Sequence, residues 1–335
     1  MNASLSLHET SVIMCEETFP IYYMTIPVDS LAAIITLIEV TAVIMEHHLR
    51  KRKAFLLISV LLAGYLLAAC GNLYSTINSI VSYTVKGDTV ICQRSCFWRQ
   101  LLLMIGYITV TDVCLIIAID RAAAIILPIW YNQRYKLWLL TMQILLIPLH
   151  AIGINSGIYA NIKDELIPYC TALSDGKNSA MILHLTTSNI LLAVTVIIYI
   201  ALIAWVKCKL YKDSETSDAV SNHHRQLRSK LLFTLAFSLF IHAFTVCLAT
   251  IIGGIAVRAG NIRETIAIGK YGSVAVANGL LNSLFLYFRM PEIRIAVLKM
   301  GRKINRISTF ASISKVLPIT SGKLPSKTQG LTTTQ

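Results

Sequence analysis

The residues best placed to do chemistry are charged side chains within or at the ends of long apolar segments. Asp120 and Arg121 are adjacent at the end of one such segment, where they can form an ion pair. Asp112 lies deeper in the same segment, and Glu39 lies inside another. Acids at such depth are costly, so each one either has a function or stays neutral through a hydrogen bond to a neighbouring helix. Both interpretations stay open for Asp112 and for Glu39.

Enzymatic chemistry has no support in the sequence. The chain contains no phosphate-binding loop, no cluster of metal-ligand residues and no nucleophile elbow. We therefore expect no enzyme, no metal and no cofactor. The net charge of +13 does not indicate nucleic acid, because Lys and Arg lie in short links between apolar runs and form no basic face interleaved with aromatics.

The composition shows which elements position these residues. Hydrophobic residues make up 55% of the 335 residues and charged residues 14%, against about 25% charged in soluble domains. Seven apolar segments are long enough to cross about 30 Å of hydrocarbon as helices. They span residues 23–46, 54–80, 97–122, 137–160, 180–206, 230–257 and 265–289. The sequence predicts an all-α fold, a seven-transmembrane helix bundle.

The distribution of basic residues predicts the orientation of this bundle. Of the 30 Lys and Arg residues, 22 fall on the side of the C-terminal tail and 8 on the other side. Basic loops stay in the cytoplasm, so we expect the N-terminus outside and the C-terminus inside a multi-pass plasma membrane protein. The first twenty residues carry no signal-peptide pattern, so the first helix directs its own insertion. Asn2 begins a glycosylation sequon on the expected outer side.

The predicted helix 97–122 carries the first family motif. Asp120-Arg121 is followed by Pro128 and Tyr131, and Cys96 precedes Arg121 by twenty-five residues, which at about 1.5 Å per residue crosses the membrane. This pattern resembles the Asp-Arg-Tyr motif of rhodopsin-like G-protein-coupled receptors, with its proline, tyrosine and outer cysteine.

The last predicted helix carries the second motif. Its end runs from Asn282 through Tyr287 to Arg289 and continues into Pro291-Glu292-Ile293-Arg294. It resembles a degraded Asn-Pro-x-x-Tyr motif that continues into a short amphipathic eighth helix, and is similar to the nematode serpentine chemoreceptors, with class sx nearest. The resemblance covers the chain to about residue 306.

The resemblance implies roles for several residues. It implies a disulfide between Cys96 and Cys170 of the second outer loop. It implies that Asp120 and Arg121 act as an activation latch, although an interfacial pair that only anchors the helix would look alike. The further residues it assigns to the latch and G-protein coupling are Pro128, Tyr131, Tyr199 and Asn282.

The chain also departs from the family pattern. Ala122 replaces the tyrosine of the first motif, and Ser283 and Leu286 replace the proline and tyrosine of the second. Gly64 stands where the second helix usually carries an aspartate, which removes the standard sodium site. Helix six lacks the usual Trp-x-Pro switch.

Four residues are candidates for a ligand pocket. Leu103 and Tyr107 lie one turn apart at the depth where family pockets form, and His184 and His242 either contact ligand or are neutral core histidines. Leu103 occupies the position at which amine receptors carry an aspartate. Without a carboxylate there, we do not expect a biogenic amine as ligand.

We therefore expect three regions: an extracellular N-terminus (1–22), a receptor domain (23–290) and a cytoplasmic amphipathic helix with a disordered tail (291–335). The expected function is chemosensory, in a plasma membrane that includes the sensory cilium. A small-molecule or peptide ligand acts outside and a heterotrimeric G protein inside, with membrane lipid around the bundle. Ser and Thr residues in the tail form either an arrestin site or a merely polar end. The rival class is a seven-helix transporter or ligand-gated channel, which should show repeats or an inside N-terminus.

Overall fold

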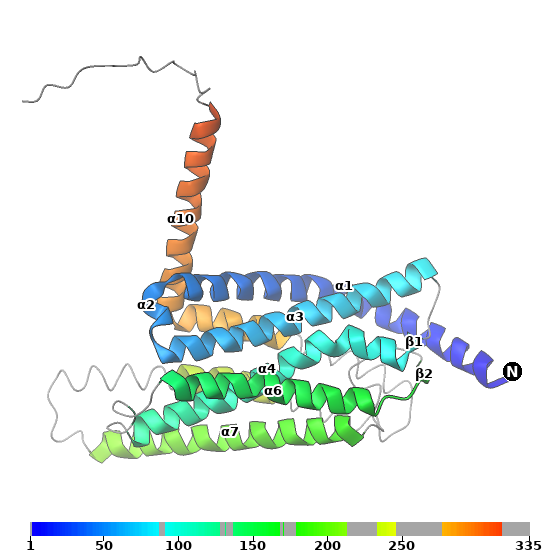
Figure 1. Ribbon diagram of the computed structural model, residues 1–335, viewed down its shortest axis with the longest axis horizontal. Helices are drawn as coiled ribbons and strands as arrows, with labels where there is room; N and C mark the ends of the chain where they lie inside the picture. The colour runs from blue at the N-terminus through cyan, green and yellow to red at the C-terminus, as the bar shows by residue number, and fades with distance from the viewer. Residues whose placement is uncertain are drawn as a thin grey trace, which may run out of the picture. The chain divides into compact units, whose positions relative to one another are not determined.

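A computed structural model of the chain shows a bundle of long helices (Figure 1). It describes residues 2–86, 91–127, 131, 137–167, 170, 179–212, 233–245 and 277–316. The long helices of the bundle are α1 (Asn2–Met45), α3 (Lys53–Lys86), α4 (Gln93–Ile126), α6 (Leu137–Ala160) and α7 (Ser179–Lys212). The single-turn helix α2 (His47–Arg50) links α1 to α3. The side chains of α1 are described from Tyr23 onward, so those of Asn2 and Cys15 lie outside the described residues.

The membrane spans agree with the sequence prediction. Five helices are long and apolar enough to cross a membrane: Tyr23–Met45, Lys53–Val85, Gln93–Ile126, Leu140–Ala160 and Ile182–Cys208. Two shorter helices, Phe233–Thr245 and 277–289, lie within the sixth and seventh expected segments. The predicted all-α seven-helix fold is confirmed.

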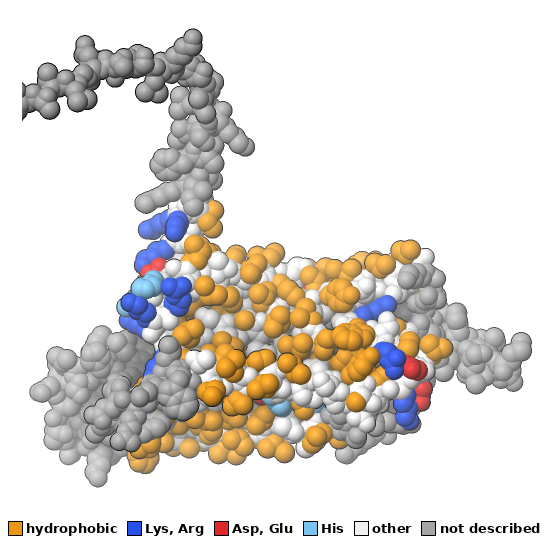
Figure 2. Space-filling model, viewed as in Figure 1, with side chains coloured by type: hydrophobic (Ala, Val, Ile, Leu, Met, Phe, Trp, Pro, Cys, Tyr) orange, Lys and Arg blue, Asp and Glu red, His pale blue; other side chains and the backbone are white. Residues whose placement is uncertain are grey.

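The exposed side chains along the length of the bundle, which would face lipid, are apolar. On α6, Leu145, Leu146 and Leu149 are more than half exposed. On α7, Ile197 and Ile200 are exposed to a similar extent. Figure 2 shows hydrophobic side chains covering the length of the bundle, with charged side chains at its two ends. A protein in water would bury these side chains, whereas lipid tails are as apolar as leucine.

Helix α3 packs against α4 on one side and against α1 on another (Figure 1). A Cβ atom on Gly106 would overlap the backbone of Ala68, and one on Gly71 would overlap the backbone of Leu103. Each helix thus contributes at least one glycine that faces the backbone of the other helix. Small residues let membrane helices pack at short distance, where van der Waals contact replaces the hydrophobic effect as the driving force.

A short strand pair and a disulfide tie the N-terminal end of α4 to the loop after α6. Strand β1 (Ile91–Cys92) pairs antiparallel with β2 (Leu166–Ile167), an element that the sequence did not predict. Cys96 and Cys170 form the expected disulfide. Gln100 donates a hydrogen bond of 2.7 Å to Ser75 on α3. Cys92 is a free thiol.

Helix α10 (Pro291–Val316) is amphipathic and longer than the short eighth helix expected from the sequence. A compact unit of the chain, Met1–Val297, includes its first turns, and the rest belongs to a second unit, Leu298–Gln335. Within the first turns Ile293 and Ala296 are buried, while Arg294 and Ile295 are exposed.

The glycine pairing predicts a large difference between two Gly→Ala substitutions. Gly106→Ala should lower the free energy of unfolding by about 1–3 kcal/mol, because α3 must move away from α4. Gly153→Ala in α6 meets nothing within 4 Å and should be neutral or stabilising, since Ala favours a helix. Thermal unfolding of both purified receptors in lipid nanodiscs measures the difference. Equal unfolding midpoints would contradict this account of the α3–α4 contact.

Candidate functional site

The C-terminal end of α4, which the sequence predicts to be cytoplasmic, holds a cluster of polar side chains. Asp120 is fully buried and forms an ion pair with Arg121. Tyr131 donates a hydrogen bond of 2.8 Å from its hydroxyl to the other carboxylate oxygen of Asp120. The ammonium of Lys53, the first residue of α3, lies 5.3 Å from the centre of the Tyr131 ring. Asp120 therefore joins α4, the segment after it and the start of α3.

Arg121 is held away from solvent in this cluster. Its side chain is 14% exposed, and its Nε atom is buried without a hydrogen-bond partner. Tyr199 on α7 is also buried, and its hydroxyl lies within range of the charges of Arg121 and Asp120. The structure thus brings together four of the expected coupling residues: Asp120, Arg121, Tyr131 and Tyr199. Pro128 lies outside the described residues.

Asn282 is the centre of a second polar cluster, in the middle of the bundle. Its amide nitrogen donates to the hydroxyl of Tyr65 at 3.0 Å and to the side-chain oxygen of Asn278. Its side-chain oxygen accepts a hydrogen bond of 2.7 Å from Ser238. Both amide hydrogens and the carbonyl oxygen of Asn282 are therefore used. They connect α3, the helix Phe233–Thr245 and the helix 277–289.

His242 joins the same cluster through Asn278. The amide nitrogen of Asn278 lies 2.7 Å from Nδ1 of His242, and an amide nitrogen only donates, so Nδ1 is the acceptor. The neutral ring then carries its proton on Nε2, which is buried and has no partner. The Tyr65 ring stands edge-on to His242, with ring centroids 6.1 Å apart.

A small cavity lies directly against this network. It is lined by Asp29, Tyr65, Ala68, Ala69, Asn72, Leu103, Tyr107, Asn278 and Gly279. Its volume is about 10 Å³, room for about one water molecule. Leu103 and Tyr107, the two pocket residues expected on α4, both line it. His242 contacts two of its lining residues, Tyr65 and Asn278.

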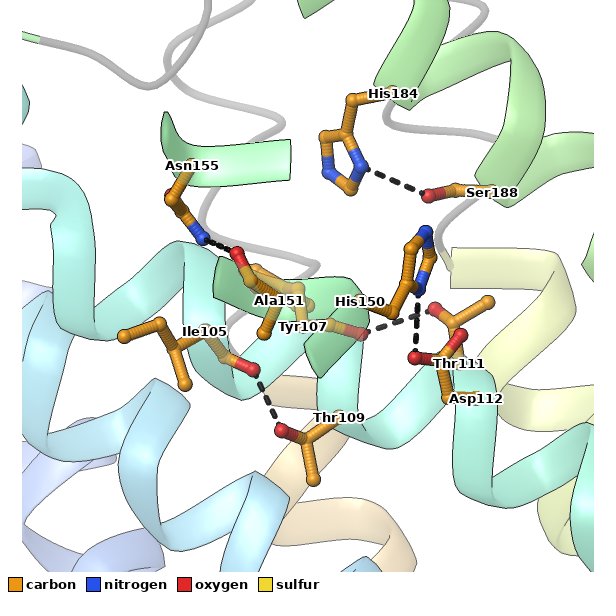
Figure 3. A network of polar contacts seen from close by, with 10 residues as sticks. All are labelled: Ile105, Tyr107, Thr109, Thr111, Asp112, His150, Ala151, Asn155, His184 and Ser188. Atoms are coloured by element: carbon orange, nitrogen blue, oxygen red, sulfur yellow. Dashed lines mark hydrogen bonds and ion pairs between the residues drawn. The ribbon is translucent and has the colours of Figure 1, made fainter. Parts of the chain in front are cut away.

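His184 lies elsewhere, toward α6. Its Nδ1 atom is 3.4 Å from the hydroxyl of Ser188 on α7, and Figure 3 shows both near the Asp112–His150 pair. Nδ1 of His150 on α6 lies 2.8 Å from the carboxylate of Asp112. Asp112 therefore has the partner on a neighbouring helix that one interpretation of the sequence required. The structure does not bring His184 into the cavity with Leu103 and Tyr107.

Comparison with known proteins agrees with a bundle of membrane-spanning helices. The family model for the serpentine type 7TM GPCR chemoreceptor Srsx matches residues 31–300, and the chain belongs to this family of seven-helix membrane chemoreceptors. The resemblance to the nematode class sx receptors is confirmed. No curated protein matches the chain.

Sequence reasoning does not single out Asp29, Tyr65 or Ser238. Tyr65 and Ser238 have residue types that are ordinary in membrane helices, so the sequence carries no signal for them. Asp29 does carry one, because an acid inside an apolar segment by default indicates function. It lies only six residues after residue 23, the predicted start of the first span, and an acid near the edge of a predicted span attracts less notice.

The central network predicts that Asn282 stabilises the folded receptor. Asn282→Ala leaves Ser238, Tyr65 and Asn278 each short of a buried hydrogen bond, which costs about 1–3 kcal/mol per unsatisfied group. The midpoint of thermal unfolding should fall by several degrees. Asn161→Ala is the control, because the side chain of Asn161 is exposed and donates a hydrogen bond to the carbonyl of Gly157 in the last turn of α6. An Asn282→Ala receptor as stable as the control would refute the network's structural role.

Proposed function

We propose that this chemoreceptor binds a small external chemical ligand in the outer half of its bundle and activates a heterotrimeric G protein inside the cell. The inner cluster around Asp120 is the observation that carries the proposal. A buried carboxylate there holds an arginine that solvent barely reaches. An arginine that is paired and shielded from solvent at the inner end of a helix can become available to a partner that arrives from the cytoplasm.

The central network supports a route between the two ends. Tyr65 and Asn278 line the cavity and also bond Asn282 or His242. The helix Phe233–Thr245 is attached to this network through Ser238 and His242. A ligand that displaces Tyr65 or Asn278 changes both attachments, and so favours a state in which this helix moves. A ligand shifts the equilibrium only by its differential affinity for the two states.

The inner cluster would respond to that motion. In the state described here Arg121 is paired to Asp120, and Tyr199 is buried on α7 within range of both charges. Separation of the inner helix ends exposes Arg121 to an incoming G-protein helix. Asp120 and Arg121 then act in coupling and not in ligand capture, because they lie at the opposite end of α4 from Leu103.

Two substitutions test this assignment. Asp120→Asn weakens the hold on Arg121 and should raise basal G-protein activation, because removing a partner of a buried ion pair costs on the order of 3–5 kcal/mol of the closed state. Arg121→Ala should abolish activation with near-normal surface expression. The measurement is G-protein dissociation in cells at matched surface levels of wild type and both variants.

The matched controls come from an exposed ion pair at the outer end. Arg94 and Asp164 lie 3.3 Å apart, with side chains 50% and 65% exposed. Asp164→Asn and Arg94→Ala should leave basal and stimulated signalling unchanged, since exposed pairs contribute little. If all four variants signal like wild type, Asp120 and Arg121 only anchor α4 at the interface.

We also propose that the N-terminus lies outside the plasma membrane and the tail inside, on the basis of the 22 to 8 distribution of Lys and Arg. An epitope tag at the N-terminus should stain on intact cells, and one at the C-terminus only after permeabilisation. Staining of the C-terminal tag on intact cells would refute both the orientation and G-protein coupling. Glycosylation of Asn2, location in a sensory cilium and arrestin binding by the tail stay predictions of the same scheme.

A further inference from the structure

Asp29 is a buried acid with an unsatisfied oxygen. Its side chain is fully buried, and one carboxylate oxygen accepts a hydrogen bond of 2.7 Å from Asn72. The other oxygen has no hydrogen-bond partner. Across the part of the chain that the structure describes, the ion pairs involve Asp112, Asp120 and Asp164, and none involves Asp29. A carboxylate in a membrane bundle without a compensating charge is costly, so a group that fills this place gains a strong interaction.

The place beside Asp29 is the small cavity described above. Asp29 lies about 9 Å along α1 from Tyr23, in the half of the bundle that carries the disulfide. Among the described residues, the other polar ones that line the cavity are Asn72, Tyr65, Tyr107 and Asn278. Its volume of about 10 Å³ admits one group the size of a water molecule.

We infer that this cavity is a site for the ammonium head of a primary amine, with Asp29 as its counter-ion. An ammonium head is close to a water molecule in size, carries the opposite charge and donates hydrogen bonds. Asp29 lines the cavity and has an oxygen left to accept one of them, and Asn72 and Tyr107 line the same cavity. An anion would meet the charge of Asp29, and a quaternary ammonium is both too large and without a donor.

This inference rests on the proposed function and names the ligand's charged group. It also replaces an expectation from the sequence. Because Leu103 stands where amine receptors carry an aspartate, the sequence predicts that an amine would lack a counter-ion. Leu103 and Asp29 line the same cavity, so α1 supplies the carboxylate that α4 lacks.

Thermal unfolding of the purified receptor in lipid nanodiscs tests the site without any G protein. The probe is methylammonium chloride, with ionic strength held constant by N-methyl-D-glucamine chloride. Wild type should show a dose-dependent rise in its unfolding midpoint of roughly 2 °C or more at saturation, because the ion binds only the folded state. Tetramethylammonium chloride should give no rise. Asp29→Asn should lose the response, and Asp112→Asn, which changes an acid on the other side of α4, should keep it.

A second variant fills the cavity without touching the acid. A Cβ atom on Gly279 would lie in ordinary contact with Tyr65, at 3.6 Å or more, so Gly279→Ala should fold normally. It should weaken the methylammonium response at least several-fold while Asp29 stays in place.

Three results would overturn the inference. The first is no midpoint shift with methylammonium in wild type, the second is an equal shift in Asp29→Asn or Gly279→Ala, and the third is an equal shift with sodium chloride, which would make this a site for a bare cation. The coupling assay on Asp120 and Arg121 tests the proposed function independently of these three results.

Discussion

The structure depends on one constraint, that polar groups inside a membrane bundle must find partners within the protein. Asn282 meets it completely, since its two amide hydrogens and its oxygen all bond other side chains. Those bonds join α3, the helix Phe233–Thr245 and the helix 277–289. Because lipid offers no replacement partner, breaking one bond obliges the freed groups to find another. The network is therefore suited to two discrete arrangements, which is what a receptor needs.

The close approach of α3 and α4 makes this network geometrically possible. Gly71 and Gly106 bring the two backbones together, and this fixes Tyr65 and Asn72 on α3 relative to Tyr107 on α4. The disulfide at Cys96 and the cluster at Asp120 hold the two ends of α4. The helix is thus clamped at both ends and along its middle, so it provides a fixed frame against which the Phe233–Thr245 helix can move.

The sequence predicts how deep a residue lies in the membrane better than it predicts which neighbouring helix the side chain faces. The interval from Cys96 to Arg121 placed both ends of α4, because rise per residue is nearly constant in a helix. Which way a side chain faces depends on how each helix is rotated against its neighbours, and hydrophobic residues on every side of a membrane helix leave little periodicity to read. Leu103 and Tyr107 were therefore placed at the right depth and do face the cavity, whereas His184 has a suitable depth but faces α6. The pairing of Asp29 with that cavity could not be read from the sequence for the same reason.

Three residues that depart from the family motifs each have a packing or hydrogen-bonding role in the structure. Gly64, at the position where an aspartate is usual, lies against Val110 and Thr109, so that part of α3 carries packing and no charge. Ser283, in place of the proline, lies 2.9 Å from Thr36 on α1, and Leu286, in place of the tyrosine, is fully buried. Among the described residues the fully buried acids are Asp120 on α4 and, in the membrane interior, Asp29 and Glu39, both on α1. Glu39 is buried as well, but it lies ten residues further along α1, toward Met45, and does not line the cavity. Loss of the charge on α3 therefore coincides with charge on α1, where Asp29 alone faces a space that a ligand's head group can enter.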